Sequence, residues 1–594
     1  MKSLGYLNKY LLKYKWLLFW GVVFIIIANV FAAIMPKVVD DAVDLVRNKL
    51  ISAKDSDNPS EIFDSLWKDA LWLGGLYILY SLLKGLFTFL KRQTVIIMSR
   101  HIEYDLKNEI YDHYQRLSLS FYKRNKTGDI MNRISEDVSK VRMYLGPGIM
   151  YTIDLVVLFL IIVPYMLMKN VELTIYVLSP LPILTLIIYY VSNQINKKSE
   201  HVQRKQSALS TFVQEAFSGI RVIKAYNREK YRIDSFDEEA IDYKSASVSL
   251  AKTNSFFMPV IMILIGLSTI LTIYIGGLKV IAGELDYGDI AQFVIYINML
   301  TWPFASVGWI TSIIQRAAAS QERINEFLKQ QPEIVSTKNA NPFTNGNIVF
   351  DNVSFVYPDS GIRALKNVSF TIEKNKVTAF TGKIGSGKST VANLIGRLYD
   401  TTEGAININE QNIKQTHLTD LRNHIGYVPQ EVFLFSDTIE NNIAFGLTDE
   451  KNISQEDIIK AAQIADVHNN IIQFKDGYKT ILGERGITLS GGQKQRVSIA
   501  RAVLRKAPIL IFDDCLSAVD TETEEKIMRN LNEVMKERTS VIISHRISSI
   551  MDADKIIVLD EGRIIQEGSH QELINQDGLY KELYEKQLLE EKLV

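Results

Sequence analysis

Six long apolar segments fill the first half of the chain. They cover residues 16–35, 70–90, 147–168, 171–192, 256–282 and 290–314. A bilayer core of roughly 30 Å requires about 20 mostly apolar residues per helix. Proline interrupts some segments, but membrane helices tolerate proline where neighbouring helices satisfy the backbone. The pattern therefore predicts an α-helical domain with six membrane spans.

The charges between these segments predict which loops face the cytoplasm. Lys and Arg near helix ends are retained there, and they are dense in the connections 91–146 and 193–255. The first outer loop is acidic instead, with Asp40, Asp41, Asp44, Asp55, Asp57 and Glu61. We therefore expect a multi-pass protein of the cytoplasmic membrane whose two termini lie in the cytoplasm.

Both long inward connections combine helical apolar spacing with dense charge, which predicts helices that continue below the bilayer. Each has a break near its middle, at 122–128 and at 217–220. On local sequence alone, a simple helical hairpin turn is an adequate interpretation of either break.

After Pro332 the pattern changes to short β-branched runs separated by turns and amphipathic helices. This alternation is typical of an α/β domain. We divide the chain into a transmembrane domain at 1–330, a polar linker at 331–347 and an α/β domain at 348–594.

Composition narrows the possible partners and compartments. The 67 Lys and Arg balance the 67 Asp and Glu, so no global basic field indicates a nucleic-acid partner. Cys515 is the single cysteine. It excludes an internal disulfide framework and fits a reducing, cytosolic location for the second half.

A glycine-rich segment follows the predicted strand 376–380 and precedes a predicted helix at 390–399. It reads Gly382, Lys383, Ile384, Gly385, Ser386, Gly387, Lys388, Ser389 and Thr390. Its glycines let backbone N–H groups converge on phosphate oxygens, and the helix N-terminus adds a favourable dipole. Lys388 is expected to neutralise the β- and γ-phosphates, and the Ser389 hydroxyl is suited to ligating Mg²⁺. The segment predicts an ATP site.

A second apolar strand, 509–512, ends in Asp513 and Asp514. In phosphoryl transfer, one such acid can hold Mg²⁺ while the next orients the attacking water. Alone, an acidic pair at a strand end is usually the start of a loop. Together with the glycine-rich segment, it predicts Asp513 as a Mg²⁺ ligand and Asp514 as a catalytic residue.

Another glycine turn opens a predicted helix at 493–504 and reads Leu489, Ser490, Gly491, Gly492 and Gln493. A Ser-Gly-Gly turn of this kind is a second anion-binding helix N-terminus. With this motif the chain resembles the ABC transporter family, whose signature has this sequence.

The resemblance implies roles for further residues. Tyr357 matches the aromatic residue that stacks on adenine, and Gln430 matches the glutamine that senses Mg²⁺ and contacts the membrane domain. His545 matches the switch histidine near the γ-phosphate, and Asp520 the D-loop at the dimer seam. Residues 483–486 resemble the segment that precedes the signature in exporters. Each has an ordinary structural explanation in isolation, but their order favours the family roles.

The membrane half resembles the exporter fold of bacterial multidrug and lipid half-transporters. By that analogy the two breaks are coupling helices, and the second, around Phe217 to Arg221, docks on the partner's nucleotide domain. In this family the signature of one subunit closes over ATP held by the other, which implies a dimer. The implied function is ATP-driven export of an amphipathic small molecule, drug or lipid. Import, for example of a metal chelate, and a non-transporting ATP-gated channel or sensor stay open as alternatives.

Asp514 departs from the family pattern, which places glutamate after the magnesium aspartate as catalytic base. Aspartate is one methylene shorter, and a displacement of about 1 Å in a catalytic group can cost roughly 10²-fold in rate. Hydrolysis at this site is therefore expected to be slow, as in one subunit of heterodimeric multidrug exporters. We favour a heterodimer whose partner carries the glutamate over a homodimer with two slow sites.

Asp154 lies in the third apolar segment. An acid within a membrane span is a functional candidate by default, and it could attract a cationic drug. We favour a solvated or Arg-paired structural residue, because Asp154 is close to the cytoplasmic end. Asn29, Gln292 and Asn298 either line a polar cavity or hold helices together.

Overall fold

The computed structural model describes residues 2–54, 59–336, 340–447, 453–483, 486 and 488–592. Asp55 and Asp57 of the acidic loop, part of the linker, and Glu484 and Arg485 lie outside this range. The chain forms two compact units. The membrane unit comprises Met1–Tyr114 and Gly128–Gln330, and the α/β unit comprises Gln115–Thr127 and Gln331–Val594.

All regular secondary structure in the described part of the membrane unit is helical. Short η1 (Lys2–Leu7) and α1 (Asn8–Lys13) precede the long helices α2 (Lys15–Lys54) and α3 (Pro59–Arg116). The third candidate span, Thr127–Lys169, consists of α5 (Thr127–Asn132), η2 (Arg133–Asp137), α6 (Val138–Met143), η3 (Tyr144–Gly148) and α7 (Ile149–Lys169). The remaining helices are α8 (Val171–Leu178), α9 (Pro180–Ser218), α10 (Ile220–Ala225), α11 (Glu229–Ser255), α12 (Phe257–Ile281) and α13 (Tyr287–Leu328).

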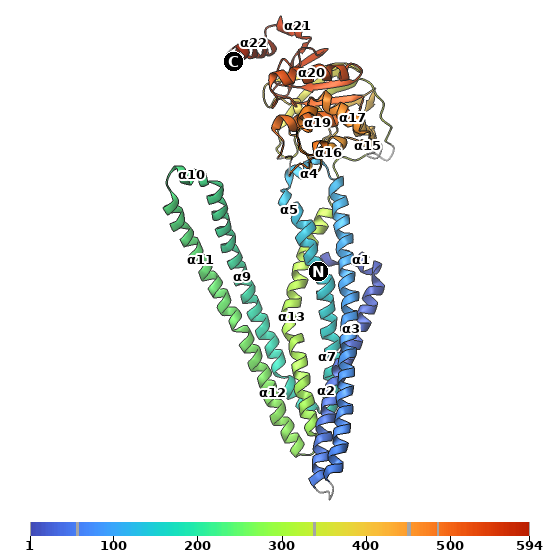
Figure 1. Cartoon of the computed structure of the whole chain (residues 1–594), viewed down its shortest axis with the longest axis vertical. Coiled ribbons are helices and arrows are strands. Elements are labelled where there is room, and N and C mark those ends of the chain that lie inside the picture. Colours follow the sequence, from blue (N-terminus) through green and yellow to red (C-terminus); the bar gives the residue numbers. More distant parts are fainter. Residues whose placement is uncertain are drawn as a thin grey trace. The chain divides into compact units, whose positions relative to one another are not determined.

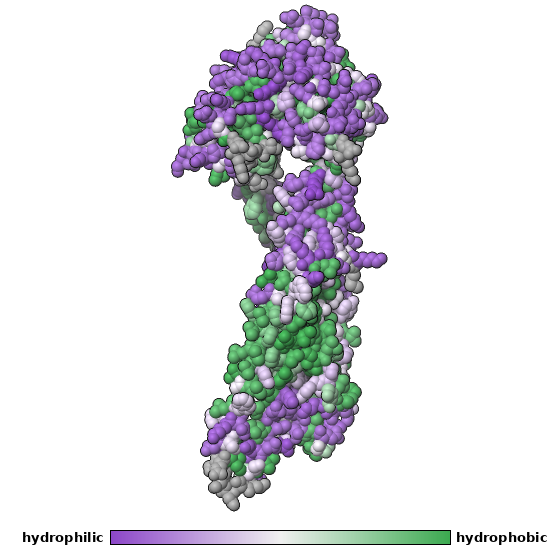
Figure 2. All heavy atoms as spheres, turned by 90° about the vertical axis from the view of Figure 1, so that its right-hand side faces the viewer, coloured by the Kyte–Doolittle hydropathy of each residue, from purple (hydrophilic) through white to green (hydrophobic). Residues whose placement is uncertain are grey.

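Six helical stretches in the described residues are long and apolar enough to cross a membrane, which confirms the predicted fold class. Their hydrophobic residues gather in a band on the face shown in Figure 2. The helices extend well past the apolar segments, as the charged helical spacing predicts. Figure 1 shows α9 and α11 side by side, joined by α10 at the second predicted break.

The first predicted break is part of the α/β unit. The segment Gln115–Thr127, which includes most of this break, contains the short helix α4 (Leu119–Arg124), which contacts the start of the linker. The hydroxyl of Ser120 donates to Glu333 Oε2 at 2.5 Å, and Arg124 forms an ion pair with Glu333 at 3.3 Å. The backbone N–H of Ile334 donates to Ser118 Oγ at 3.0 Å. These contacts attach a segment between the second and third spans to the second unit.

The α/β unit contains two sheets. An antiparallel sheet has the strand order β2 (Arg363–Ile372), β1 (Ile348–Val356), β4 (Glu403–Ile408) and β5 (Gln411–Asn412). The main sheet has the order β10 (Arg563–Gly568), β9 (Lys555–Asp560), β3 (Val377–Gly382), β8 (Thr539–Ile543), β7 (Ile509–Asp513) and β6 (Ile425–Val428). All neighbours in the main sheet are parallel except β10 with β9.

The helices of this unit are α14 (Lys388–Ile395), α15 (Leu418–Asn423), α16 (Ile439–Ala444), α17 (Gln455–Ile464), α18 (His468–Ile472), α19 (Gly491–Leu504), α20 (Thr521–Met535), α21 (His570–Ile574) and α22 (Leu579–Lys592). Single 3-10 turns lie at η4 (Ile413–Gln415) and η6 (Gly477–Lys479). Because α14 ends before Gly396, it is shorter than the helix predicted at 390–399, and it begins earlier, at Lys388.

Parallel pairing brings three loops to one edge of the main sheet. In the ladder, Phe380 of β3 pairs with Ile543 of β8, and Ile543 also pairs with Asp513 of β7. The carboxyl ends of parallel strands meet at the same edge, where open α/β sheets bind ligands. The glycine-rich segment, the acidic pair and the loop carrying His545 therefore begin beside one another.

Candidate functional site

The glycine-rich segment turns sharply because its glycines adopt backbone angles that other residues avoid. Gly382 and Gly387 have φ of 137° and 102°. A Cβ at Gly382 would lie 1.9 Å from the carbonyl oxygen of Leu559, and one at Gly387 would lie 2.4 Å from that of Ala364. Glycine is required at both positions, and the loop can therefore approach a phosphate with its backbone.

Lys388 folds back into this loop and is 5% exposed. Its ammonium donates to the carbonyl oxygens of Gly382 and Lys383 at 3.0 and 2.7 Å, and to Ser386 Oγ at 3.3 Å. Burial lowers the pKa of Lys388 to about 8, although the nearby Asp514 and Asp513 oppose the shift. The ammonium thus has neutral acceptors but little solvation, and a phosphate would supply the missing counter-charge.

Ser389 and Asp513 place two oxygen ligands side by side. The Ser389 hydroxyl donates to Asp513 Oδ1 at 2.8 Å. Asp513 is 2% exposed, and burial raises its pKa to about 6, while the Ser389 hydrogen bond opposes the shift. Hydroxyl and carboxylate oxygens are the donors Mg²⁺ prefers, so these two residues fit the predicted ligand role.

Asp514 has an unusual backbone conformation for a residue with a side chain. Its φ is 47°, and its N–H donates to the carbonyl oxygen of Ile543 at 2.8 Å. Aspartate tolerates the left-handed region better than most residues. The side chain accepts a hydrogen bond from Gln430 Nε2 at 3.3 Å, so the structure brings Gln430 and the second acid together.

His545 follows β8 and is half-buried. Burial lowers the pKa of His545, the positive charge of Lys388 lowers it further, and Asp514 opposes both. The imidazole is therefore neutral at neutral pH, and one ring nitrogen can accept a hydrogen bond while the other donates. His545 lies two residues after Ile543, whose carbonyl oxygen accepts from the N–H of Asp514, so the loop that carries the histidine begins beside the second acid.

Tyr357 lies at the side of this site. Its hydroxyl is 2.9 Å from Thr390 Oγ1 on α14, and its ring makes edge contacts with Phe355 and Tyr399. Lys123 of α4 places its ammonium 5.3 Å from the centroid of the Tyr357 ring. Sequence reasoning did not single out Lys123, because nothing local signals a contact with a residue more than two hundred positions away.

The signature turn is built by a capping box at the start of α19. The N–H of Ser490 donates to Gln493 Oε1 at 3.0 Å, and the N–H of Gln493 donates to Ser490 Oγ at 3.3 Å. Because the Ser490 cap starts the helix, α19 begins at Gly491, two residues before the predicted start. A Cβ at Gly492 would lie 2.8 Å from the carbonyl oxygen of Ala518. Leu489 is buried below the turn, whereas Ser490 and Gly491 are exposed.

The signature helix is tied to the D-loop of the same chain, which comprises residues 517–520. Gln495 donates to Ser517 Oγ at 3.2 Å and accepts from the N–H of Ala518 at 3.1 Å. Asp520 then caps α20 by accepting from the N–H of Thr523 at 3.0 Å, and these hydrogen bonds lower the pKa of Asp520. A shift of the D-loop would therefore reach the signature through Gln495.

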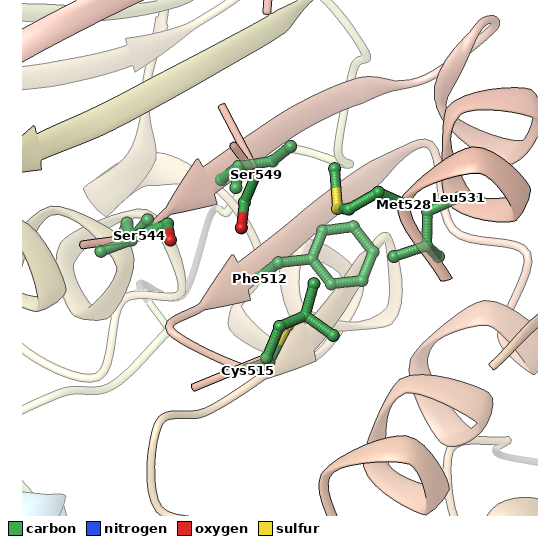
Figure 3. Close-up of a pocket in the computed structure, with 9 residues that line it drawn as sticks. Phe512, Cys515, Met528, Leu531, Ser544 and Ser549 are labelled. Carbon is green, nitrogen blue, oxygen red and sulfur yellow. The ribbon is translucent and has the colours of Figure 1, made fainter. Parts of the chain in front are cut away.

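A small cavity lies beside the strands that carry the acids and the histidine (Figure 3). Its volume is about 20 Å³, and its lining includes Phe512, Cys515, Met528, Leu531, Ser544 and Ser549. Such a volume holds about one water molecule and no nucleotide. Burial raises the pKa of the Cys515 thiol, which fits a packing role for this residue.

In the membrane unit, Asp154 of α7 is paired. Lys91 of α3 forms an ion pair with Asp154 Oδ1 at 2.8 Å, and Asn29 of α2 donates to the same oxygen at 2.9 Å. This favours the structural interpretation of Asp154, with lysine in place of the expected arginine. Gln292 is buried and donates to Tyr165 and to Tyr296, as expected of a residue that holds helices together.

Known proteins match the chain over both units. Residues 18–304 match the ABC transporter transmembrane region, and residues 365–517 match the ABC transporter family. The probable multidrug resistance ABC transporter ATP-binding/permease protein YheI of Bacillus subtilis is 33% identical, with 99% of this chain and 98% of that protein covered. The ATP-dependent lipid A-core flippase of Syntrophus aciditrophicus is 33% identical, with 88% and 86% covered.

A solved structure matches as well. A bacterial Atm1-family ABC exporter with ATP bound superposes with a TM-score of 0.75 at 26% identity, with 98% of this chain and 99% of that chain covered. The matched length includes both units, so the similarity extends from the membrane helices to the main sheet of the α/β unit. The chain therefore belongs to the ABC transporter family, as an exporter-type membrane domain followed by a domain that couples ATP hydrolysis to transport.

Proposed function

We propose that the chain is one half of a dimeric exporter that uses ATP and Mg²⁺ to move an amphipathic small molecule, drug or lipid across the cytoplasmic membrane. The observation that carries this proposal is the group formed by the buried Lys388 and Asp513 and the half-buried Ser389, after the ends of β3 and β7. The multidrug and lipid A-core names of the relatives support the substrate class.

Each side chain of this group is proposed to have a separate role. Lys388 exchanges its loop carbonyls for phosphate oxygens, and the exchange neutralises the ammonium that burial leaves poorly solvated. Ser389 and Asp513 would hold Mg²⁺, which supplies charge neutralisation at the transferring phosphate. Asp514 orients the attacking water, with Gln430 and His545 beside it.

A dimer is part of the proposal because the signature turn is exposed. Ser490 and Gly491 present a helix N-terminus to solvent, and such a terminus attracts an anion. In the family, that anion is ATP held by the other subunit. The proposed cycle is ATP-driven closure, outward reorientation of the membrane helices, hydrolysis and reset, which is a population shift driven by differential ATP affinity.

The partner is proposed to be a different half-transporter. Asp514 is the only support for this choice, since its short side chain predicts slow hydrolysis here and a glutamate in the partner. Purification of the tagged chain from native membranes, followed by mass measurement of the intact complex, tests it. A second half-transporter supports the heterodimer, whereas a mass of two identical chains supports the homodimer.

Flux in inside-out vesicles tests the transport direction. ATP-dependent accumulation of an amphipathic dye or a labelled lipid is expected, and Lys388→Ala vesicles are expected to show none. Depletion of the probe on ATP addition would support an importer instead. An ATP-gated leak that runs down the gradient in both directions would support a channel.

A further inference from the structure

The C-terminal helix α22 reaches the loop that carries His545. Gln587 of α22 donates from Nε2 to the carbonyl oxygen of His545 at 2.6 Å. Its Oε1 accepts from the backbone N–H of Ile547 at 2.7 Å. One side-chain amide therefore satisfies a backbone acceptor and a backbone donor two residues apart. The pair of hydrogen bonds fixes both the distance between α22 and the loop and the orientation of the loop.

The position of Gln587 follows from the anchoring of α22. Tyr580 is fully buried, its hydroxyl lies 2.6 Å from His570 Nδ1, and its N–H donates to Gln566 Oε1 at 3.1 Å. Tyr584 packs against His570 one turn later. Tyr580, Tyr584 and Gln587 are spaced i, i+4 and i+7, so they share one face of the helix. Anchoring that face presents the amide of Gln587 to the loop.

A second element holds the same loop. Glu524 of α20 is 3% exposed and pairs with Arg546, the residue after His545. Arg546 also donates to the carbonyl oxygen of Val519 at 3.3 Å, and Ser549 donates to Glu524. The loop is thus fixed by a buried acid on α20 and by a half-buried amide on α22.

We propose that Gln587 is a positioning residue for His545, and that α22 thereby sets the rate of ATP hydrolysis without setting nucleotide affinity. The proposal rests on the proposed role of His545 beside the γ-phosphate. Removing the amide leaves the His545 carbonyl and the Ile547 N–H without this partner, and the peptide between them gains freedom. Nucleotide binding depends on Lys388 and its neighbours, which Gln587 does not contact in the described structure.

The test is steady-state ATPase kinetics of the full chain in lipid, produced without other half-transporters and assembled as a homodimer, so that each ATP site contains both His545 and Gln587. Gln587→Ala is expected to lower kcat roughly tenfold, because a catalytic displacement of about 1 Å can cost up to 10²-fold, with little change in KM for ATP. Gln587→Glu keeps the acceptor for Ile547 and loses the donor to His545. Its kcat is therefore expected to lie between that of the wild type and that of Gln587→Ala. Glu585→Ala, an exposed neighbour on α22, is the matched control.

A double variant separates positioning from general stability. In a His545→Ala background, Gln587→Ala is expected to have no further effect on kcat, because Gln587 acts only through His545. A multiplicative loss in that background, or a change confined to KM, would overturn the proposal. If His545→Ala alone leaves kcat unchanged, the role of His545 fails and this proposal fails with it, while the nucleotide site of Lys388 and Asp513 stands.

Discussion

The ammonium of Lys123 lies 5.3 Å from the centroid of the Tyr357 ring. Lys123 belongs to α4, a short helix in the connection between the second and third membrane spans. Tyr357 is the proposed adenine-stacking residue. Both belong to the α/β unit. A cation over a tyrosine ring contributes about 0.5–1 kcal/mol at an exposed site. The contact links a segment connected directly to the membrane helices with the proposed adenine position.

Lys123→Ala is therefore expected to raise the affinity for ATP about two- to fivefold, because adenine no longer competes with the ammonium for the ring. Affinity for inorganic tripolyphosphate, which lacks the base, is not expected to rise. Titration calorimetry of both ligands checks this, with Lys126→Ala, an exposed lysine nearby, as control. Equal changes for the two ligands would mean that Lys123 acts on the phosphates.

Lys388→Ala is expected to weaken ATP binding by roughly 10- to 100-fold, since a hydrogen bond to a charged group contributes about 1.5–3 kcal/mol. Nucleotide photolabelling of the purified chain measures the loss. Lys376→Ala removes an exposed lysine just before β3 that pairs with Glu373, and labelling is expected to persist in it. Photolabelling of Lys388→Ala at wild-type strength would contradict the proposed nucleotide site.

Asp514→Glu is expected to raise the ATPase rate of a homodimer by up to roughly 10²-fold, because the longer side chain reaches the family's position for the base. The left-handed backbone at Asp514 adds a cost, since glutamate tolerates this region less well than aspartate. Thermal unfolding should show a loss of no more than about 1 kcal/mol. An unchanged ATPase rate in a folded variant would remove the argument for a slow site.

Asp154→Asn and Lys91→Met are each expected to destabilise the membrane unit by roughly 3 kcal/mol, because each leaves a charge unpaired among the helices. The double variant should lose less stability than the sum of the losses in the two single variants. Unfolding of the wild type, the two single variants and the double variant in detergent measures these stabilities. If Asp154 instead serves a cationic substrate, Asp154→Asn will abolish cation transport while stability stays at the wild-type value.

The sequence by itself determined the features that depend on neighbouring residues. Apolar length predicts each span, a β-branched run predicts each strand, and the glycine spacing at Gly382 to Ser389 predicts the phosphate loop, because each pattern is local. The fold class and the family follow from these patterns and from the order of the motifs. They are the parts that the structure and the relatives confirm.

Only the tertiary structure decided which distant residues meet. Lys91 rather than an arginine pairs with Asp154, α4 joins the α/β unit, and Gln587 holds the backbone at His545. The left-handed conformation of Asp514 likewise depends on the strands around it. These relationships depend on helix register and on the packing of elements far apart in the chain, and no local pattern encodes either of them.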